Sequence, residues 1–469
     1  SEQRNKQLIK NTAILTIGKI CTQFISFFLL PLYTSILMPG DYGTVDLLST
    51  YVSLLLPLVN WQLDQGIFRF LIETRNDEER EKIVISTAFF TNLLQAVAYI
   101  LIFLLIYIIW NYEYLWFLTI NVVLNIFSAL LMQTARGIGR MTDYAISSFL
   151  SAVGTVSLNV LFLVALHLGM KGMMYSLICA QIITVLYLSI RLNIIHYISL
   201  KCYSKQCFKE LISYSAPLIP NSLSWWVMGG SDRTVISAVL GTYFNGLYSV
   251  ANKFSTIFIT FYNFFNMSWT ETVTLHIYDA DGEQYLKATI NSLFSLFVSL
   301  CIGFIACMPF VYPIFINQQY ADGYYQVPIL MLAVLCQVLV GLYSAIYVAK
   351  KKSKEIAKTS IMSAIINLVV NVALIHWIGL YAASFSTFVA YASMAVYRYH
   401  DIKKYIDARL DKKLILKTII LSAFVLFTYY LRQPILQCVA LIITVIDAVL
   451  SNKKILLSAL QMAIQKMKH

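Results

Sequence analysis

Hydrophobic residues form long, almost uninterrupted runs along the chain, and short polar stretches separate them. A helix needs about twenty mostly apolar residues to cross the hydrocarbon core of a bilayer, and fourteen runs have roughly that length. They cover approximately residues 11–37, 43–72, 83–110, 114–134, 144–168, 172–195, 211–240, 243–273, 286–316, 325–349, 356–377, 379–399, 414–431 and 433–450. Turn-forming segments such as "MPGDYG" and "HLGMKG" punctuate them. The pattern predicts an all-α polytopic membrane protein with about 14 transmembrane helices.

Basic residues are distributed unevenly between the two sides of these spans. If the N-terminus is cytoplasmic, most of the 35 Lys and Arg residues lie in inner loops or in the two tails. The exceptions are Lys171 and Arg432 in outer connections, and Lys19, Arg69, Arg233 and Lys253 within spans. Cytoplasmic loops characteristically carry such an excess. We therefore expect both termini to be cytoplasmic.

Composition narrows the class of protein further. The chain of 469 residues is 59% hydrophobic and 12% charged, and its formal net charge is +12. Because that charge faces the anionic inner leaflet, we expect no nucleic-acid partner. All predicted connections are short and contain no P-loop, so we expect no enzymatic activity and no cofactor. The eight cysteines lie mostly in apolar runs without zinc-ligand spacing, so we expect no metal site.

An internal repeat relates the two halves of the chain. A shift of 203 residues places "ILMPGDYGTVDL" (36–47) over "VLGTYFNGLYSV" (239–250), and a shift of 207 aligns Gly172 with Gly379 and Arg191 with Arg398. We therefore predict two pseudo-symmetric six-helix lobes, residues 1–205 and 206–400, followed by two helices and a cytoplasmic tail in residues 401–469. Six spans per lobe imply parallel repeats with a cavity between them.

Polar residues recur at helical spacing within the first two spans. The stripe in span 1 contains Thr12, Thr16, Lys19, Gln23 and Ser26, and that in span 2 contains Asp46, Thr50, Ser53, Pro57, Asn60 and Asp64. The repeat places similar stripes in spans 7 and 8, with Arg233 at the next step of the first and Lys253 in the second. Two interpretations stay open for the uncharged members: a wet cavity, or hydrogen bonds between packed helices.

The charged members point more directly to function. Lys19 lies about 12 Å and Lys253 about 15 Å into their spans, too deep for snorkelling to the interface. Charges at such depth are costly and commonly mark substrate or ion pathways. A cavity lined by Lys and Arg favours an anion such as a phosphate.

The remaining charged residues in or near the spans each have more than one interpretation. Asp232 could neutralise Arg233, although neighbouring side chains on a helix point apart. Arg69 lies near the inner end of span 2, where snorkelling alone explains it. Asp64 is a candidate partner of Lys19 or Arg69, and a candidate for coupling to an ion.

Three motifs resemble a known family. These are "LMPGDYGTVDL" opening span 2, "NWQLDQGIFRFLIE" closing it, and "SDRTVISAVLGTYFNGLYSVANKF" joining spans 7 and 8. They are similar to the Wzx-type polysaccharide flippases (O-antigen, capsule or exopolysaccharide) of the multidrug/oligosaccharidyl-lipid/polysaccharide (MOP) exporter superfamily. The resemblance covers the whole chain in topology and is confined mainly to spans 1–2 and 7–8 at the level of motifs.

The resemblance implies a function and a location. Such proteins move undecaprenyl-diphosphate-linked oligosaccharide repeat units to the outer leaflet of the bacterial cytoplasmic membrane by alternating access. The resemblance assigns diphosphate binding to Lys19, Arg233 and Lys253, with Arg69 as a weaker fourth residue. The implied partners are membrane lipids, the lipid-linked oligosaccharide, Na⁺ or H⁺ as candidate coupling ions, and other polysaccharide-assembly proteins, with the chain acting as a monomer.

Two alternatives share the fold. A cation-coupled multidrug antiporter would need acidic residues in the first lobe, and span 1 has none. A flippase for the lipid-linked peptidoglycan precursor would favour arginine, whereas two of the deep cations here are lysines.

Overall fold

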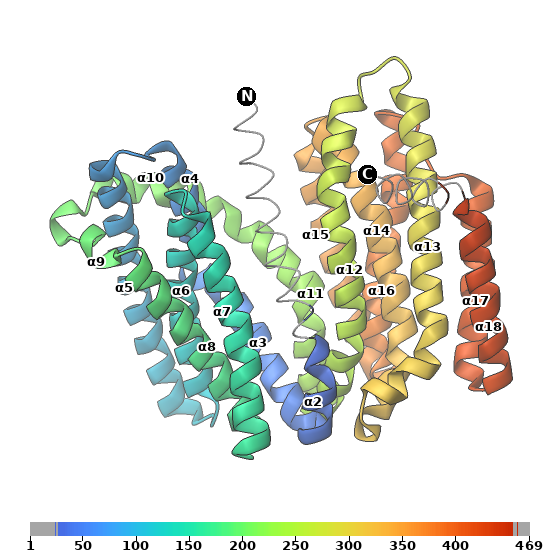
Figure 1. Ribbon diagram of the computed structural model, residues 1–469, viewed down its shortest axis with the longest axis horizontal. Coiled ribbons are helices and arrows are strands. Elements are labelled where there is room, and N and C mark those ends of the chain that lie inside the picture. Colours follow the sequence, from blue (N-terminus) through green and yellow to red (C-terminus); the bar gives the residue numbers. More distant parts are fainter. Residues whose placement is uncertain (1–23, 25–26, 454–456, 458–469) are drawn as a thin grey trace, which may run out of the picture. The chain divides into compact units, whose positions relative to one another are not determined.

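The computed structural model describes residues 24, 27–453 and 457, and these residues form helices with no β-strand among them (Figure 1). The chain divides into two compact units, Ser1–Thr234 and Val235–His469. The boundary between the units falls inside one helix, α11 (Ile219–Val239). Compactness and repeat symmetry are different criteria, so the lobes at 1–205 and 206–400, with 401–469 appended, stay a prediction.

The first unit is built around α6, which contacts α3, α4, α5, α7 and α8. Its helices are α2 (Leu30–Ile36), α3 (Pro39–Val59), α4 (Leu63–Glu73), α5 (Glu78–Trp110), α6 (Leu115–Gly137), α7 (Met141–Asn159) with the π-helical η1 (Val160–Ala165), α8 (Gly169–Arg191), α9 (Ile194–Tyr197), η2 (Leu200–Cys202), α10 (Lys205–Ser215) and η3 (Ala216–Leu218). A cluster of buried side chains, among them Leu63, Ile67, Ile85 and Leu130, joins α4, α5, α6, α8, α9 and α10. This apolar cluster forms a core of the unit.

The second unit is centred on α14, which contacts α12, α13, α15 and α16. Its elements are α12 (Thr242–His276), α13 (Gly282–Phe315), η4 (Gln318–Gln326), α14 (Val327–Ala349), α15 (Ser353–Ile378), α16 (Tyr381–Asp401), η5 (Ile402–Lys404), α17 (Lys412–Leu431) and α18 (Pro434–Ser451). The last two helices pack against α13 and against each other. The final pair of predicted spans is therefore present as two helices.

Ten of the described helical segments are long and apolar enough to cross a membrane. Three further helices of 21 to 35 residues, α11, α12 and α16, fall outside that group. They carry charged and polar residues, including Arg233, Lys253 and Arg398, that lower their hydropathy. Most of predicted span 1 lies outside the described residues, so the count of fourteen stays a prediction.

Exposed apolar side chains indicate where lipid contacts the helices. On α5, Leu94 is 71% exposed, and Ile108 and Ile109 are 77% and 74% exposed. A soluble protein would not leave a helix face of this kind in water. The chain is therefore a multi-pass membrane protein, and the exposed face of α5 contacts the hydrocarbon of the lipid.

The predicted continuous span 43–72 is wrong, because the chain leaves the helix between α3 and α4. Pro57 removes one backbone donor near the end of α3. The Asn60 side chain then accepts a hydrogen bond from the Gln62 backbone N–H at 2.9 Å, and both Trp61 and Gln62 adopt positive φ. An asparagine that binds backbone two residues on forms a turn in place of helix.

The predicted span 211–240 is also divided. Helix α10 ends at Ser215, a short 3₁₀ segment follows, and α11 starts at Ile219. Pro217 lies in this segment and Pro220 in the first turn of α11. Proline lacks a backbone N–H, so each of them removes one α-helical hydrogen bond where α10 passes into α11. The residues before them, Ala216 and Ile219, keep right-handed helical φ and ψ.

Candidate substrate-binding site

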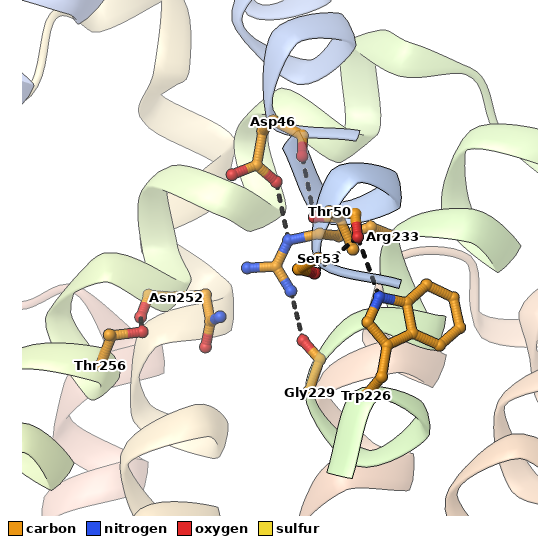
Figure 2. Close-up of polar contacts among 8 residues, drawn as sticks. All are labelled: Asp46, Thr50, Ser53, Trp226, Gly229, Arg233, Asn252 and Thr256. Atoms are coloured by element: carbon orange, nitrogen blue, oxygen red, sulfur yellow. Dashed lines mark hydrogen bonds and ion pairs between the residues drawn. The ribbon is translucent and has the colours of Figure 1, made fainter. Parts of the chain in front are cut away.

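Arg233 on α11 is bound by a carboxylate of α3 (Figure 2). Its Nε lies 2.7 Å from Oδ2 of Asp46, and its Nη1 donates to the Gly229 carbonyl at 2.6 Å. The two side chains are only 13% and 14% exposed. All three residues belong to the first unit. The arginine that the sequence places inside a span is therefore charge-compensated by Asp46.

A second contact one turn away joins the same two helices. The indole Nε1 of Trp226 donates to the Thr50 carbonyl at 2.9 Å, and the Thr50 hydroxyl donates to the Asp46 carbonyl at 2.8 Å (Figure 2). Thr50 and Asp46 lie four residues apart and so share one face of α3. Part of the polar stripe of the second predicted span therefore faces the middle of α11.

Gly230 allows α11 to approach α3 this closely. A Cβ at this position would lie 2.9 Å from Cγ2 of Thr50 and 2.9 Å from Nε1 of Trp226. These distances are below van der Waals contact, so a larger residue would push the helices apart. By contrast, a Cβ at Gly229 meets no atom within 4 Å among the described residues.

The Arg233–Asp46 pair changes what the site can do chemically. A bare guanidinium would attract any anion, but here the anion must compete with a carboxylate already in place. Removing one partner of a mostly buried ion pair leaves the other uncompensated, which typically costs about 3–5 kcal/mol. Planar guanidinium groups also bind other anions that offer several acceptor oxygens.

Asp64 and Arg69 do not pair with each other. Asp64, in the first turn of α4, accepts hydrogen bonds from Asn60 Nδ2 at 3.1 Å and Gln65 Nε2 at 2.7 Å. Arg69 Nη2 binds Glu73 Oε1 at 2.7 Å, and both side chains are about half exposed. The alternative partner of Asp64, Lys19, lies outside the described residues. Arg69 is thus a half-exposed cation, and Glu73, one turn along the helix, offsets its charge.

Two further candidates, Asp232 and Lys253, lie on α11 and α12. Asp232 is buried, at 2% exposure, on α11 beside Arg233. Lys253 is half-buried on α12 and belongs to the second unit. The grouping of Lys19, Arg233 and Lys253 around one ligand therefore stays a prediction.

Asp46 is the partner of Arg233 that sequence reasoning missed. It appeared only as the first member of a polar stripe, whereas Asp232 was the partner considered for the arginine. The available signal was the scarcity of acids deep in the spans, since a buried cation requires a nearby anion or acceptor.

Two solved structures have a fold similar to that of this chain. A solved structure of lipid II flippase MurJ in an inward closed conformation is similar to this chain, with a TM-score of 0.67 and 16% identity over 96% of this chain and 100% of that one. An inward-facing multidrug resistance MATE family transporter of the MOP superfamily gives a TM-score of 0.65 with 14% identity, over 82% of this chain and 95% of that one. The chain therefore has the fold of MOP superfamily transporters.

The family follows from a separate comparison. A family model described as "Polysaccharide biosynthesis protein" matches residues 8–270, which is more than half of the chain. The chain therefore belongs to the polysaccharide biosynthesis protein family. No curated protein matches the sequence.

Proposed function

We propose that this protein is a flippase that moves undecaprenyl-diphosphate-linked oligosaccharide repeat units from the cytoplasmic to the outer leaflet of a bacterial cytoplasmic membrane. Family membership and the fold shared with a lipid II flippase support a lipid-linked, sugar-bearing substrate. The observation that carries the proposal is the mostly buried Arg233, held by the Asp46 carboxylate at 2.7 Å. Alternating access of the two lobes would move the head group while the isoprenoid tail stays in lipid.

In this mechanism the diphosphate takes the place of Asp46 on Arg233. The carboxylate that is released is then next to a doubly negative ligand, and such a neighbour favours its protonation. Asp46 therefore joins Asp64 as a candidate site for coupling to H⁺ or Na⁺. Lys19 and Lys253 would supply further positive charge, and Arg69 a weaker contribution near the inner end.

A charge-balance experiment tests the role of Arg233. In proteoliposomes with an undecaprenyl-diphosphate-linked oligosaccharide, we would compare wild type with Arg233→Gln, Asp46→Asn and the double variant, after confirming folding by size exclusion. The double variant removes both charges, so it leaves neither one buried alone. We expect it to fold and to lose at least about tenfold of the flipping rate, since a charged hydrogen bond is worth about 1.5–3 kcal/mol. Recovery of wild-type flipping by the double variant would mean that the pair is purely structural.

The second candidate function is a cation-coupled multidrug antiporter, favoured by the similarity to a MATE family transporter. A cationic dye offered to the same proteoliposomes separates the two functions. We expect wild type to flip the lipid-linked sugar and to ignore the dye. Dye transport that survives Lys19→Gln, Arg233→Gln and Lys253→Gln, without lipid-sugar flipping, would establish the antiporter and refute the flippase.

A further inference from the structure

A cavity of about 460 Å³ lies at one end of the second unit. It is enclosed by the last turns of α13, the start of η4, the connection between α17 and α18, and the first turn of α18. All of these elements belong to Val235–His469. In the predicted topology this end of the unit faces the outside of the membrane. Its volume is within the range of small-ligand sites, about 300–1,000 Å³.

Arg432 is the cation at this cavity, and its position is unusual in two respects. It is one of only two basic residues that the predicted topology assigns to outer connections. Its φ of 54° places it in the left-handed conformation at the end of α17, where glycine or asparagine is preferred. An arginine held in this conformation suggests that the side chain has a purpose there.

Tyrosines hold the guanidinium of Arg432 in place. It lies 5.4 Å from the ring centre of Tyr324 and 5.6 Å from that of Tyr325, and Nη1 donates to the Tyr325 hydroxyl at 2.8 Å. Tyr324 in turn stacks on Tyr429 at 4.2 Å, and the Tyr429 hydroxyl donates to the Tyr324 carbonyl at 2.7 Å. Among the described residues no carboxylate lies within ion-pair distance of Arg432. The cation is therefore positioned by aromatic rings and not neutralised by them.

The rest of the lining combines hydrogen-bonding groups with an apolar wall. Gln318 and Gln437 present amides, each with both donors and acceptors. Pro313 has no backbone N–H, so the carbonyl of Pro309, which also lines the cavity, lacks its usual helical donor. Ile316 and the two proline rings supply apolar surface. Hydroxyl groups that both donate and accept, on a ring with apolar C–H faces, match such a lining.

We propose that this cavity binds an acidic sugar, a hexuronic acid or a sugar of like charge, on the outer side of the membrane. The carboxylate would meet Arg432, the hydroxyls would meet the two glutamines and the freed carbonyl, and the ring face would contact proline. The proposal rests on the proposed function, which supplies a glycan to this side. It adds that the glycan carries an acidic residue and that the second unit holds it after translocation.

Direct binding to the purified full chain tests this without any transport step. Saturation-transfer difference NMR would compare cellobiouronic acid with cellobiose, which differ by one carboxylate. We expect the acid to bind at least about tenfold more tightly, the equivalent of one charged hydrogen bond. Equal affinity for the two sugars, or no saturation transfer to either, would overturn the proposal.

Two variants and a control locate the binding. Arg432→Gln should abolish the preference for the acid. Gln318→Glu should do the same, because it keeps the arginine but adds to the cavity a negative charge that repels the carboxylate of the ligand. Arg409→Gln should leave the preference intact, because Arg409 is held by Asp407 at 2.7 Å and precedes α17 while Arg432 follows it. Preference surviving in both cavity variants would refute the assignment.

Competition distinguishes a sugar site from a general anion site. Glycerol 3-phosphate carries the charge of a lipid head group without a pyranose ring. We expect it to compete at least about tenfold more weakly than cellobiouronic acid, and competition at equal strength would show that the cavity recognises charge alone. Wild-type flipping of lipid-linked sugar without uronic acid binding would refute this cavity and leave the proposed function standing. Binding of the uronic acid without flipping of lipid-linked sugar would support the cavity and refute the proposed function.

Discussion

Arg233 shows how a charge inside a predicted span is stabilised by a residue that is distant in sequence. Asp46 is 187 positions away, and its oxygen lies 2.7 Å from the guanidinium. The sequence indicated that the arginine needed compensation, because an isolated charge at that depth is costly. It could not indicate the partner, since pairing between two stripes depends on how the helices are rotated and how closely they approach.

Gly230 controls that approach, and the neighbouring glycine provides a matched control. Gly230→Ala should destabilise the protein by about 1–3 kcal/mol, because the added methyl group overlaps Thr50 and Trp226. Gly229→Ala should be neutral or slightly stabilising, since its Cβ meets no described atom within 4 Å and alanine favours a helix. Thermal unfolding of both variants in the same detergent measures the difference. Equal melting temperatures would contradict the close approach of α11 to α3.

At the scale of helices, the Arg398 side chain connects three helices of the second unit. It is fully buried on α16 and donates to the Val340 carbonyl at 3.0 Å, to the Ser344 hydroxyl, and to the Thr359 hydroxyl at 2.7 Å. Its partners lie on α14 and α15, so one side chain joins three helices. The repeat aligned it with Arg191, which instead binds Asp143 at 3.0 Å with its side chain 55% exposed.

Replacing Arg398 should therefore have a large effect on stability. We expect Arg398→Met to cost about 3 kcal/mol, because at least two buried acceptors lose their donors. Arg409→Gln, which removes a partly exposed pair, should cost at most about 1 kcal/mol. Denaturant or thermal unfolding compares them. A similar small loss in both would mean that Arg398 is not a structural link.

Helix α18 gives a further example at this scale. Asp447 Oδ1 lies 2.7 Å from Nζ of Lys417 on α17. The two residues are thirty positions apart on antiparallel neighbours. Such a pair becomes visible only when the helices are packed, although both helices were correctly predicted from hydropathy.

For the whole molecule, the distribution of basic residues predicts orientation. Cys202 lies in a connection assigned to the cytoplasm, and Lys171 is in an outer connection. In a chain whose other cysteines are replaced by alanine, a membrane-impermeant thiol reagent should spare Cys202 in intact cells. The same reagent should label Lys171→Cys in a Cys202→Ala background. Labelling in the opposite pattern would invert the topology.

The membrane potential should bias flipping if a diphosphate is carried. Moving two negative charges outward across an inside-negative membrane releases about 4–5 kcal/mol per 100 mV. We expect a K⁺ diffusion potential, inside negative, to raise the outer-leaflet fraction of the lipid-linked sugar in proteoliposomes. Flipping that persists with the potential collapsed and a Na⁺ or H⁺ gradient intact would assign the drive to an ion.

The sequence by itself determined the helical membrane class, the positions of most spans and the family resemblance. Hydropathy and turn chemistry act over a few residues, so they can be recognised along the chain. Hydropathy did not predict the interruptions at Asn60 and Ser215, because local hydrogen bonds and prolines there act against an otherwise apolar pattern. Only the tertiary structure decided that Asp46 holds Arg233, that Arg398 joins three helices and that Arg432 lines a cavity. These contacts link residues far apart in the chain, and they form because helix packing brings particular faces within hydrogen-bonding distance.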